Sequence, residues 1–368
     1  MSPANITHRK FHPQLEGLRA FAIFFIILSH WTTVEPVPAY WMEWAGVWGV
    51  TYFYVLSGFL IGNILLIEKE NIPEGNFKRT GKALGNFYMR RILRTLPAFY
   101  ILLIVLIVLK FPYDISCVSP WFFLNLSNLY FFFCNCFGEA NTLIGHFWTL
   151  AVEEQFYLIF PLLIFFVPKR FAFRSIFIMG MFGIACRMAL YLLKFEYFRI
   201  FTFSSFDAFA LGALLSYARI HNLSIPYAKL ITVVSFLLYI FLPTHDLIYF
   251  TGKSFVNWLV PAGAIFCAGI IFFASGNGIP GMTFILENKL VLFIGKIGYG
   301  LYLYHMFVPS LTVYLLTLAG FSSLSTLLIL FIEAIFLILI ASASYYLIEK
   351  PIYSQKKYFK YTALSNET

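Results

Sequence analysis

Long apolar runs separated by short polar connections dominate this chain. Each run is about twenty residues long, the length of a helix that crosses a lipid bilayer. The pattern therefore predicts an all-α fold, a polytopic membrane helix bundle of about ten transmembrane helices. The predicted spans are residues 16–34, 46–67, 95–111, 147–167, 172–193, 200–218, 227–243, 255–274, 290–312 and 324–348.

The run WFFLNLSNLYFFF at 121–133 is too short and too rich in asparagine for a span, so we assign it to the membrane interface or a re-entrant segment. The first apolar run lacks the small-residue cleavage site of a signal peptide, and we expect it to be a retained helix. No repeat, low-complexity tract or appended soluble domain is evident. Residues 1–368 are therefore expected to form one integral-membrane domain.

Composition points the same way. Of 368 residues, 60% are hydrophobic and 12% are charged, whereas about a quarter are charged in soluble proteins. These values exclude an ordinary water-soluble globule. The net charge of +9 is attributed to lysine and arginine kept on the cytoplasmic face, and not to nucleic-acid binding.

Basic residues gather in alternate connections. The connection between the second and third predicted spans is rich in them, whereas residues 112–146 contain no lysine or arginine. The positive-inside rule then places both termini in the cytoplasm. Lys194 and Arg199, in a short predicted outer loop, are exceptions. The basic residues of the second-to-third connection are Lys69, Lys78, Arg79, Lys82, Arg90, Arg91 and Arg94.

The redox state of the cysteines is not determined by the sequence. Cys117, Cys134 and Cys136 fall in the predicted outer connection, where either a disulfide or free thiols are possible. The five cysteines of the chain show no paired spacing typical of zinc ligands, so we expect no metal site.

The first span carries two polar residues on one face. Arg19 and His30 are eleven positions apart, close to three helical turns, which separates them by about 16 Å along the axis. Arg19 is either part of a site or an anchor that reaches lipid headgroups. His30 taken alone would be a packing histidine bonded to a carbonyl oxygen.

Titratable residues of three other spans are predicted at the same depth as His30. These are Glu153 and Glu154, Asp207, and His305. Ionisable groups inside a membrane are costly unless they face a cavity or a partner, so we predict a polar cavity in the outer half of the bundle. Successive helical residues point about 100° apart. One of the two glutamates should therefore face the cavity, and the other should bond to a neighbouring helix.

Arg91 and Arg94 lie three residues apart before the third predicted span, as neighbours on one helix face. Their planar guanidinium groups suit phosphate, and with Arg19 they favour an anionic cytosolic ligand over a purely topological role. In the second span, Ser57 and Gly58 indicate either close helix packing or the passage of a slender ligand.

An anion site inside and a base-like histidine toward the outside suit a long bipolar donor. Acyl-coenzyme A has this shape, with a phosphorylated head and a thin arm that ends in a thioester. His30 would deprotonate an acceptor hydroxyl, and a carboxylate would orient the imidazole. A covalent acyl-histidine is the other possibility, and the sequence does not decide between them.

Six segments resemble the signature motifs of the membrane-bound acyltransferase family 3, whose members O-acylate cell-surface carbohydrates. The matches follow the family's order over nearly the whole chain. They are Arg19 to His30, GVTYFYVLSGFLI, Arg91 to Arg94, HFWTLAVEEQFY at 146–157, YGLYLYH and IEKP.

The resemblance implies ten helices, an acyl-coenzyme A donor and a bacterial inner-membrane location. It implies that His30 is catalytic, that Arg19 with Arg91 and Arg94 supports the donor, and that Glu153 is the more demanding acid of its pair. Glu154, Asp207 and His305 remain candidate substrate-binding residues. The sequence departs from the family pattern at three positions: Thr149 replaces serine, Glu16 stands where aspartate is more usual, and Ser205 stands where many relatives carry arginine.

We therefore expect an enzyme, an O-acyltransferase of the membrane. It would move an acyl group, expected to be acetyl, from cytosolic acyl-coenzyme A to a hydroxyl of a surface polysaccharide such as lipopolysaccharide, or of its lipid-linked precursor. Some relatives continue into an extracellular hydrolase-like domain, whereas this sequence stops at Thr368, so transfer is expected to finish in the membrane domain or with a separate partner.

The alternative is a proton-coupled secondary transporter of a small anionic solute or glycan precursor, because carriers also bury carboxylates and histidines. Carriers commonly show two related halves with paired broken helices, which this sequence does not show. Lipid and a glycan are the expected partners, without nucleic acid. The acceptor sugar, the acyl length and the oligomeric state stay open.

Overall fold

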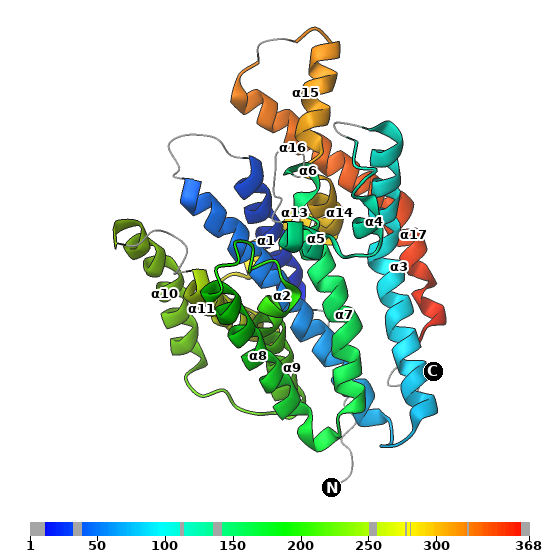
Figure 1. The fold of residues 1–368 in the computed structure, drawn as a ribbon, viewed down its shortest axis with the longest axis vertical. Coiled ribbons are helices and arrows are strands. Elements are labelled where there is room, and N and C mark those ends of the chain that lie inside the picture. The colour runs from blue at the N-terminus through cyan, green and yellow to red at the C-terminus, as the bar shows by residue number, and fades with distance from the viewer. Residues whose placement is uncertain are drawn as a thin grey trace.

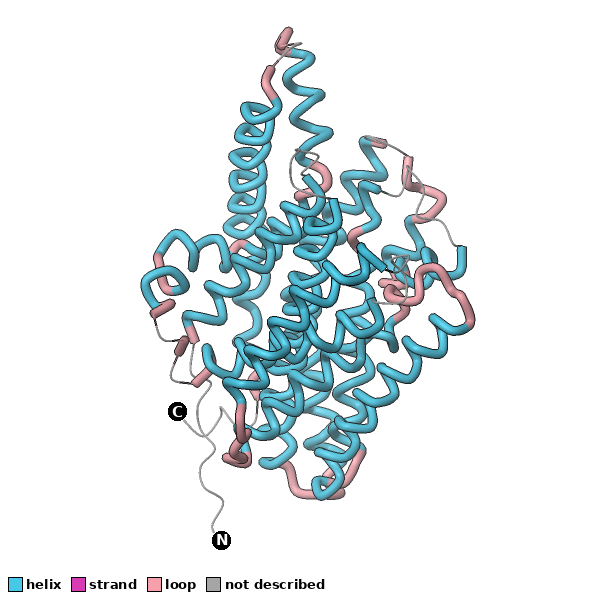
Figure 2. The backbone as a smooth tube through the Cα atoms, turned by 90° about the vertical axis from the view of Figure 1, so that its left-hand side faces the viewer, coloured by secondary structure: helices cyan, strands magenta, loops and turns pink. Residues whose placement is uncertain are grey.

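The computed structural model describes residues 12–31, 39–110, 114–134, 142–249, 256–276, 278–279, 281–321 and 324–361. Within these ranges every regular element is helical, as predicted (Figure 2). The helices are α1 (Pro13–Trp31), α2 (Ala39–Asn71), α3 (Phe77–Leu109), α4 (Ser119–Phe123), α5 (Ser127–Cys134), α6 (Thr142–Gly145), α7 (Trp148–Phe166), α8 (Ala172–Leu192), α9 (Phe206–Ile220), α10 (Ala228–Tyr249), α11 (Val256–Ala274), α12 (Thr283–Leu286), α13 (Lys289–Lys296), α14 (Gly298–Tyr304), α15 (Val308–Leu318), α16 (Thr326–Ser344) and α17 (Lys350–Ser354). A π-helical turn at Tyr345–Glu349 joins α16 to α17.

The bundle contains helices long and apolar enough to cross a membrane, but fewer than the ten that were predicted are found in the described part of the chain. Five helical stretches in the described part of the chain are long and apolar enough to cross a membrane, and there are six if α14 and α15 count as one bent span. α10 and α11 contribute shorter apolar stretches, Ala228–Phe241 and Val260–Ala274. The helical class is confirmed, whereas ten spans and cytoplasmic termini stay predictions.

The prediction of one continuous helix over 290–312 is wrong. The segment forms α13, α14 and the start of α15, and α14 and α15 meet at an angle of 65° (Figure 1). Pro309 lies in the first turn of α15, where a missing N–H costs nothing, but it could not continue α14 without breaking the hydrogen-bond ladder. The break places His305 directly after α14, where the chain changes direction.

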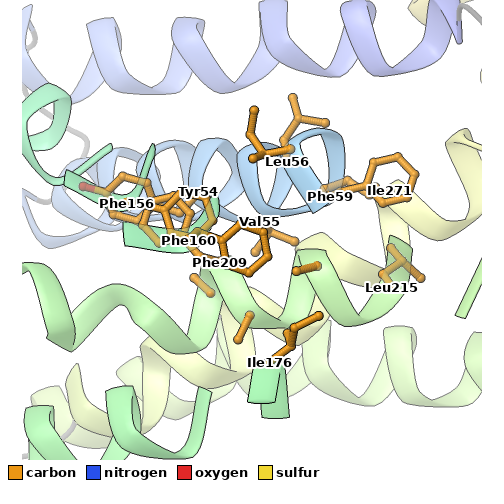
Figure 3. Packing of buried hydrophobic residues seen from close by; sticks show 14 of the residues in the cluster. Tyr54, Val55, Leu56, Phe59, Phe156, Phe160, Ile176, Phe209, Leu215 and Ile271 are labelled. Carbon is orange, nitrogen blue, oxygen red and sulfur yellow. The ribbon is translucent and has the colours of Figure 1, made fainter. Parts of the chain in front are cut away.

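Helix α2 lies at the centre of the bundle and packs most extensively on α9 and α1. A Cβ atom on Gly58 would lie 2.0 Å from the carbonyl oxygen of Phe209, and one on Gly212 would lie 1.9 Å from that of Val55. The two helices therefore touch through their backbones, so the packing interpretation of Gly58 is confirmed. Buried aromatic rings fill the space alongside, with Phe156 stacked on Phe209 at 4.0 Å between centroids (Figure 3).

Helix α3 begins well before the predicted third span and carries the arginine-rich segment as helix. Asn86 donates to the carbonyl oxygen of Lys360, and Arg90 donates to those of Lys356 and Phe359. The first half of α3 therefore holds the C-terminal segment that follows α17.

The segment 121–133 forms no single span. It folds into the short helices α4 and α5, and α5 packs on α7. Cys117 is a free and exposed thiol and Cys134 is exposed, whereas Cys136 lies outside the described residues. At the far end of the bundle, α15 and the start of α16 form a hairpin that projects beyond the neighbouring helices (Figures 1 and 2).

Candidate active site

The adjacent glutamates of α7 are directed at two different helices. Glu153 accepts hydrogen bonds from Ser57 of α2 and from Tyr157, one turn further along α7. Glu154 accepts from Thr95 of α3 at 2.6 Å. This divergence follows from the rotation of about 100° per helical residue. Both side chains remain partly exposed.

Gln155, the third polar residue of the same stretch, bonds in yet another direction. Its Nε2 donates to the carbonyl oxygen of Asn125 and to the side-chain oxygen of Asn128, both at 2.8 Å. Its Oε1 accepts from Thr202, which precedes α9. Gln155 therefore ties the α4–α5 segment and the start of α9 to α7, which is a structural role.

Three histidines, His30, His146 and His305, meet where α1 approaches the break after α14; we call them the histidine cluster. Nδ1 of His30 lies 2.8 Å from the carbonyl oxygen of Ile26 and 3.3 Å from Nε2 of His305. Nδ1 of His305 lies 2.6 Å from the carbonyl oxygen of Tyr302. The ring of His146 lies edge-on to that of His305, with 4.8 Å between centroids.

The three histidines differ in exposure. His305 is completely buried and His146 is 5% exposed, whereas His30 is an exposed residue. Both ring nitrogens of His146 are buried and have no hydrogen-bond partner of good geometry among the residues that the structure describes. His146 was not among the predicted site residues. It is the first residue of the segment HFWTLAVEEQFY, and its position in that segment could have identified it as a candidate.

The expected contact between His30 and a carboxylate is not present. Within the described residues, the side chain of His30 has polar contacts with Ile26, Ser29 and His305. Glu153 is linked to the histidine cluster only indirectly. It is an electrostatic neighbour of Tyr302, whose hydroxyl donates to the carbonyl oxygen of His146 at 2.6 Å. Four helices were predicted to bring titratable residues together. Of these residues, His30 of α1 and His305 after α14 are in contact.

We call Arg19 of α1 and Arg91 and Arg94 of α3 the arginine cluster; Arg19 lies in the half of α1 that is farther from His30. Arg19 pairs with Glu16 of the same helix at 2.6 Å. Glu16 is also an electrostatic neighbour of Arg94, so the predicted association of the α1 and α3 arginines is consistent with the structure. The Arg91 guanidinium lies over the ring of Tyr157 at 5.2 Å.

The two α3 arginines of this cluster have hydrogen-bonding capacity to spare. Within the described residues, Arg91 and Arg94 make no salt bridge and no side-chain hydrogen bond, and Nε of Arg91 is buried without a partner. Arg90, in contrast, is satisfied by two backbone carbonyl groups. A guanidinium group with free N–H groups is well suited to bidentate binding of phosphate.

The π-helical turn brings in Glu349, an acid that was not among the predicted site residues. Glu349 accepts a hydrogen bond from Ser344 at 2.9 Å and is an electrostatic neighbour of Arg94. Tyr353, one turn further, has its ring 5.9 Å from the Arg94 guanidinium. Glu349 of the segment IEKP is therefore an electrostatic neighbour of the arginine cluster.

Asp207 has a partner of its own, which the sequence did not reveal. Its carboxylate forms two bonds with the guanidinium group of Arg187 on α8, at 2.6 and 3.0 Å, and both residues are buried. Arg187 also donates to the carbonyl oxygen of Ser204 at 2.7 Å. This geometry joins α8 to the start of α9, and it accounts for the buried acid without a substrate.

Two pockets in the described part of the chain lie away from the residues of the predicted polar cavity. One pocket of about 230 Å³ lies at the α2–α3 turn beside Lys69 and Lys169, and one of about 190 Å³ lies between α9, α10 and α11. Neither is lined by either cluster. Among the described residues, no group of three or more potential ligands is arranged to hold a metal.

Comparison with known proteins gives a consistent match. A family model described as an acyltransferase domain matches residues 12–346. The O-acetyltransferase OatA of Staphylococcus aureus strain NCTC 8325 / PS 47 is 29% identical over 386 residues, with 95% of this chain and 58% of that protein covered. The OatA protein of strain COL gives the same values. The chain thus spans little more than half the length of these curated relatives. No solved structure matches.

Proposed function

The chain belongs to this acyltransferase family, and from that premise we propose that it is a membrane O-acyltransferase. It transfers an acyl group, acetyl in the first instance, from acyl-coenzyme A on the cytosolic side to a hydroxyl group of a surface polysaccharide or its lipid-linked precursor. The protein resides in the bacterial inner membrane, with ten spans and both termini in the cytoplasm. Its O-acetyltransferase relatives support the reaction class.

The observation that carries the proposal is that Arg91 and Arg94 on α3 make no salt bridge and no side-chain hydrogen bond within the described residues. Arg94 is an electrostatic neighbour of Glu16, which pairs with Arg19 at one end of α1, and His30 lies at the other end. The distance along the helix between Arg19 and His30 is about 16 Å. A donor with anionic phosphates at one end and a thioester at the end of a thin arm fits such a separation.

The chemistry proposed for His30 is general base catalysis. The imidazole removes the proton of the acceptor hydroxyl while the hydroxyl oxygen forms an ester bond to the acyl carbon. The carbon–sulfur bond of the thioester breaks, and the thiolate of coenzyme A takes up the proton. Transfer through an acyl-histidine uses the same residue as a nucleophile and remains the alternative.

Glu153 is proposed to act on the site from α7, because Ser57 and Tyr157 donate to it and Arg94 and Tyr302 are its electrostatic neighbours. It therefore lies between the arginine and the histidine clusters. Of the other candidate substrate residues, Glu154 is retained, although Thr95 already donates to it, whereas Asp207 is bound by Arg187 and His305 contacts Tyr302 and His30.

The experiment is direct. Detergent-purified protein is supplied with acetyl-coenzyme A labelled in the acetyl group and with surface glycan from cells that lack this gene. We expect labelled ester on the glycan, and release of the label by mild base. A transporter would leave the glycan unlabelled, and that result would exclude the proposed reaction. Mass spectrometry of the glycan from cells with and without the gene then identifies the acceptor position.

A further inference from the structure

His305 is held in one orientation by contacts on several sides. Trp31 of α1 donates from its indole Nε1 to the carbonyl oxygen of His305 at 2.7 Å. Nδ1 of the His305 ring lies 2.6 Å from the carbonyl oxygen of Tyr302, and the residue is completely buried. The ring therefore has little freedom to rotate, and its Nε2 lies 3.3 Å from Nδ1 of His30.

The acceptors around the two rings determine where their protons lie. A carbonyl oxygen can only accept, so Nδ1 of His305 carries a proton, and Nε2 of the neutral ring is then an acceptor. Nδ1 of His30 faces that nitrogen and the carbonyl oxygen of Ile26, which are both acceptors. Nδ1 of His30 therefore carries the proton, and the lone pair of His30 lies on Nε2.

We propose that His305 is the positioning residue of His30. Its Nε2 accepts the hydrogen bond from Nδ1 of His30, fixes the tautomer together with Ile26, and leaves Nε2 of His30 free to react. The inference rests on the proposed function, in which His30 is the reacting group. When Nε2 takes the hydroxyl proton, the positive charge of the imidazolium is stabilised by the acceptor at Nδ1. A carboxylate has this part in other catalytic sites, and here a second imidazole takes it.

Substitutions at His305 separate positioning from packing. His305→Phe keeps a ring of similar size but removes the acceptor, and His305→Gln restores an acceptor through its amide oxygen. We expect kcat for acetyl transfer to fall roughly 10²-fold in the phenylalanine variant, with an unchanged KM for acetyl-coenzyme A. The glutamine variant should regain roughly tenfold of that loss. Equal losses in both variants, or an effect confined to KM, would overturn the proposal.

His221→Phe is the matched control. His221 is an exposed histidine whose ring lies against Tyr217 at the end of α9, with 4.1 Å between centroids. Its replacement should leave kcat unchanged. If His305→Phe does not reach the membrane as folded protein, His305→Asn replaces it, because the shorter amide does not extend as far toward His30.

A second measurement does not depend on transfer. Diethyl pyrocarbonate modifies neutral imidazole at the nitrogen that bears the lone pair, and mass spectrometry of the purified protein gives the rate at each histidine. His30 should be modified much faster than the buried His305, since it is exposed. His305→Phe should slow modification of His30 roughly tenfold, and His305→Gln should restore it.

The two measurements distinguish the two proposals. An unchanged modification rate in His305→Phe would exclude positioning, whatever the enzyme transfers. The expected change in rate, in a wild-type protein that transfers no acetyl group from acetyl-coenzyme A, would retain the positioning role of His305 and exclude the proposed function.

Discussion

The polar side chains near the two ends of α1 differ in their hydrogen bonding. In the histidine cluster, His30 and His305 bond to each other and to backbone carbonyl oxygens, although the ring nitrogens of His146 have no partner of good geometry among the described residues. At the arginine cluster, Arg91 and Arg94 keep N–H groups without partners among the described residues. Satisfied groups are suited to holding a fixed geometry for chemistry, whereas unsatisfied cations are suited to binding an anion. This difference supports our proposal that the reaction takes place at the histidine end and that the donor binds at the arginine end.

The largest effect is expected at the histidine end. His30→Ala should lower kcat by about 10²- to 10⁴-fold, the contribution of a positioned general base, while binding of coenzyme A stays intact. Acetyl transfer and coenzyme A binding by isothermal titration calorimetry, both in detergent, measure the two properties. A variant that keeps full activity, or one that loses binding as well, would break the division between the two ends.

A paired arginine provides the reference for the unpaired ones. Asp207→Asn leaves the buried Arg187 without its counter-ion, and breaking such a pair typically costs about 3–5 kcal/mol of folding stability. We expect a markedly lower melting temperature in detergent, with a normal KM for acetyl-coenzyme A at temperatures where the protein stays folded. A raised KM with unchanged stability would instead make Asp207 a substrate residue, as the sequence first indicated.

Arg94→Ala is expected to act on binding. The loss of charge-assisted hydrogen bonds to phosphate should raise KM for acetyl-coenzyme A by about tenfold or more and change kcat little. Arg94→Lys keeps the charge but not the planar fork, so it should recover only part of the loss. If the wild type and the alanine variant show identical kinetics over a range of acetyl-coenzyme A concentrations, the arginine cluster does not bind the donor and serves only membrane topology.

The smallest effect is expected at Arg90, which serves as the matched control on the same helix. Its guanidinium already bonds to the carbonyl oxygens of Lys356 and Phe359, so Arg90→Gln should cost about 1 kcal/mol of stability and leave KM unchanged. Thermal melts and the same kinetic assay test this. If Arg90→Gln and Arg94→Ala raise KM equally, a general loss of positive charge explains both.

The sequence predicted the helical class, the membrane setting and the residues at both ends of α1, because each of these follows from a short-range pattern. Apolar runs, an eleven-residue spacing and an RxxR segment need no knowledge of tertiary contacts. The same logic predicted that Glu153 and Glu154 would diverge, and they bond to Ser57 and Thr95.

What the sequence could not provide were partners from distant segments. Arg187 lies in a run that reads as lipid-facing helix, and only packing of α8 against α9 brings it to Asp207. Glu349 reaches the arginine cluster through a π-helical turn that apolar periodicity does not indicate. Pro309 indicates a break after α14, but the prediction of one helix over 290–312 followed hydropathy alone and passed over this proline.

The backbone contact between α2 and α9 has a mechanical consequence. Carbonyl oxygens of Val55 and Phe209 occupy the positions that side chains of Gly212 and Gly58 would need, so these helices interlock and cannot slide or rotate past each other. We expect α2 and α9 to move as one rigid unit in the middle of the bundle. If entry of the proposed acceptor requires the bundle to open, we expect the opening at other contacts, such as the bend between α14 and α15 next to His305.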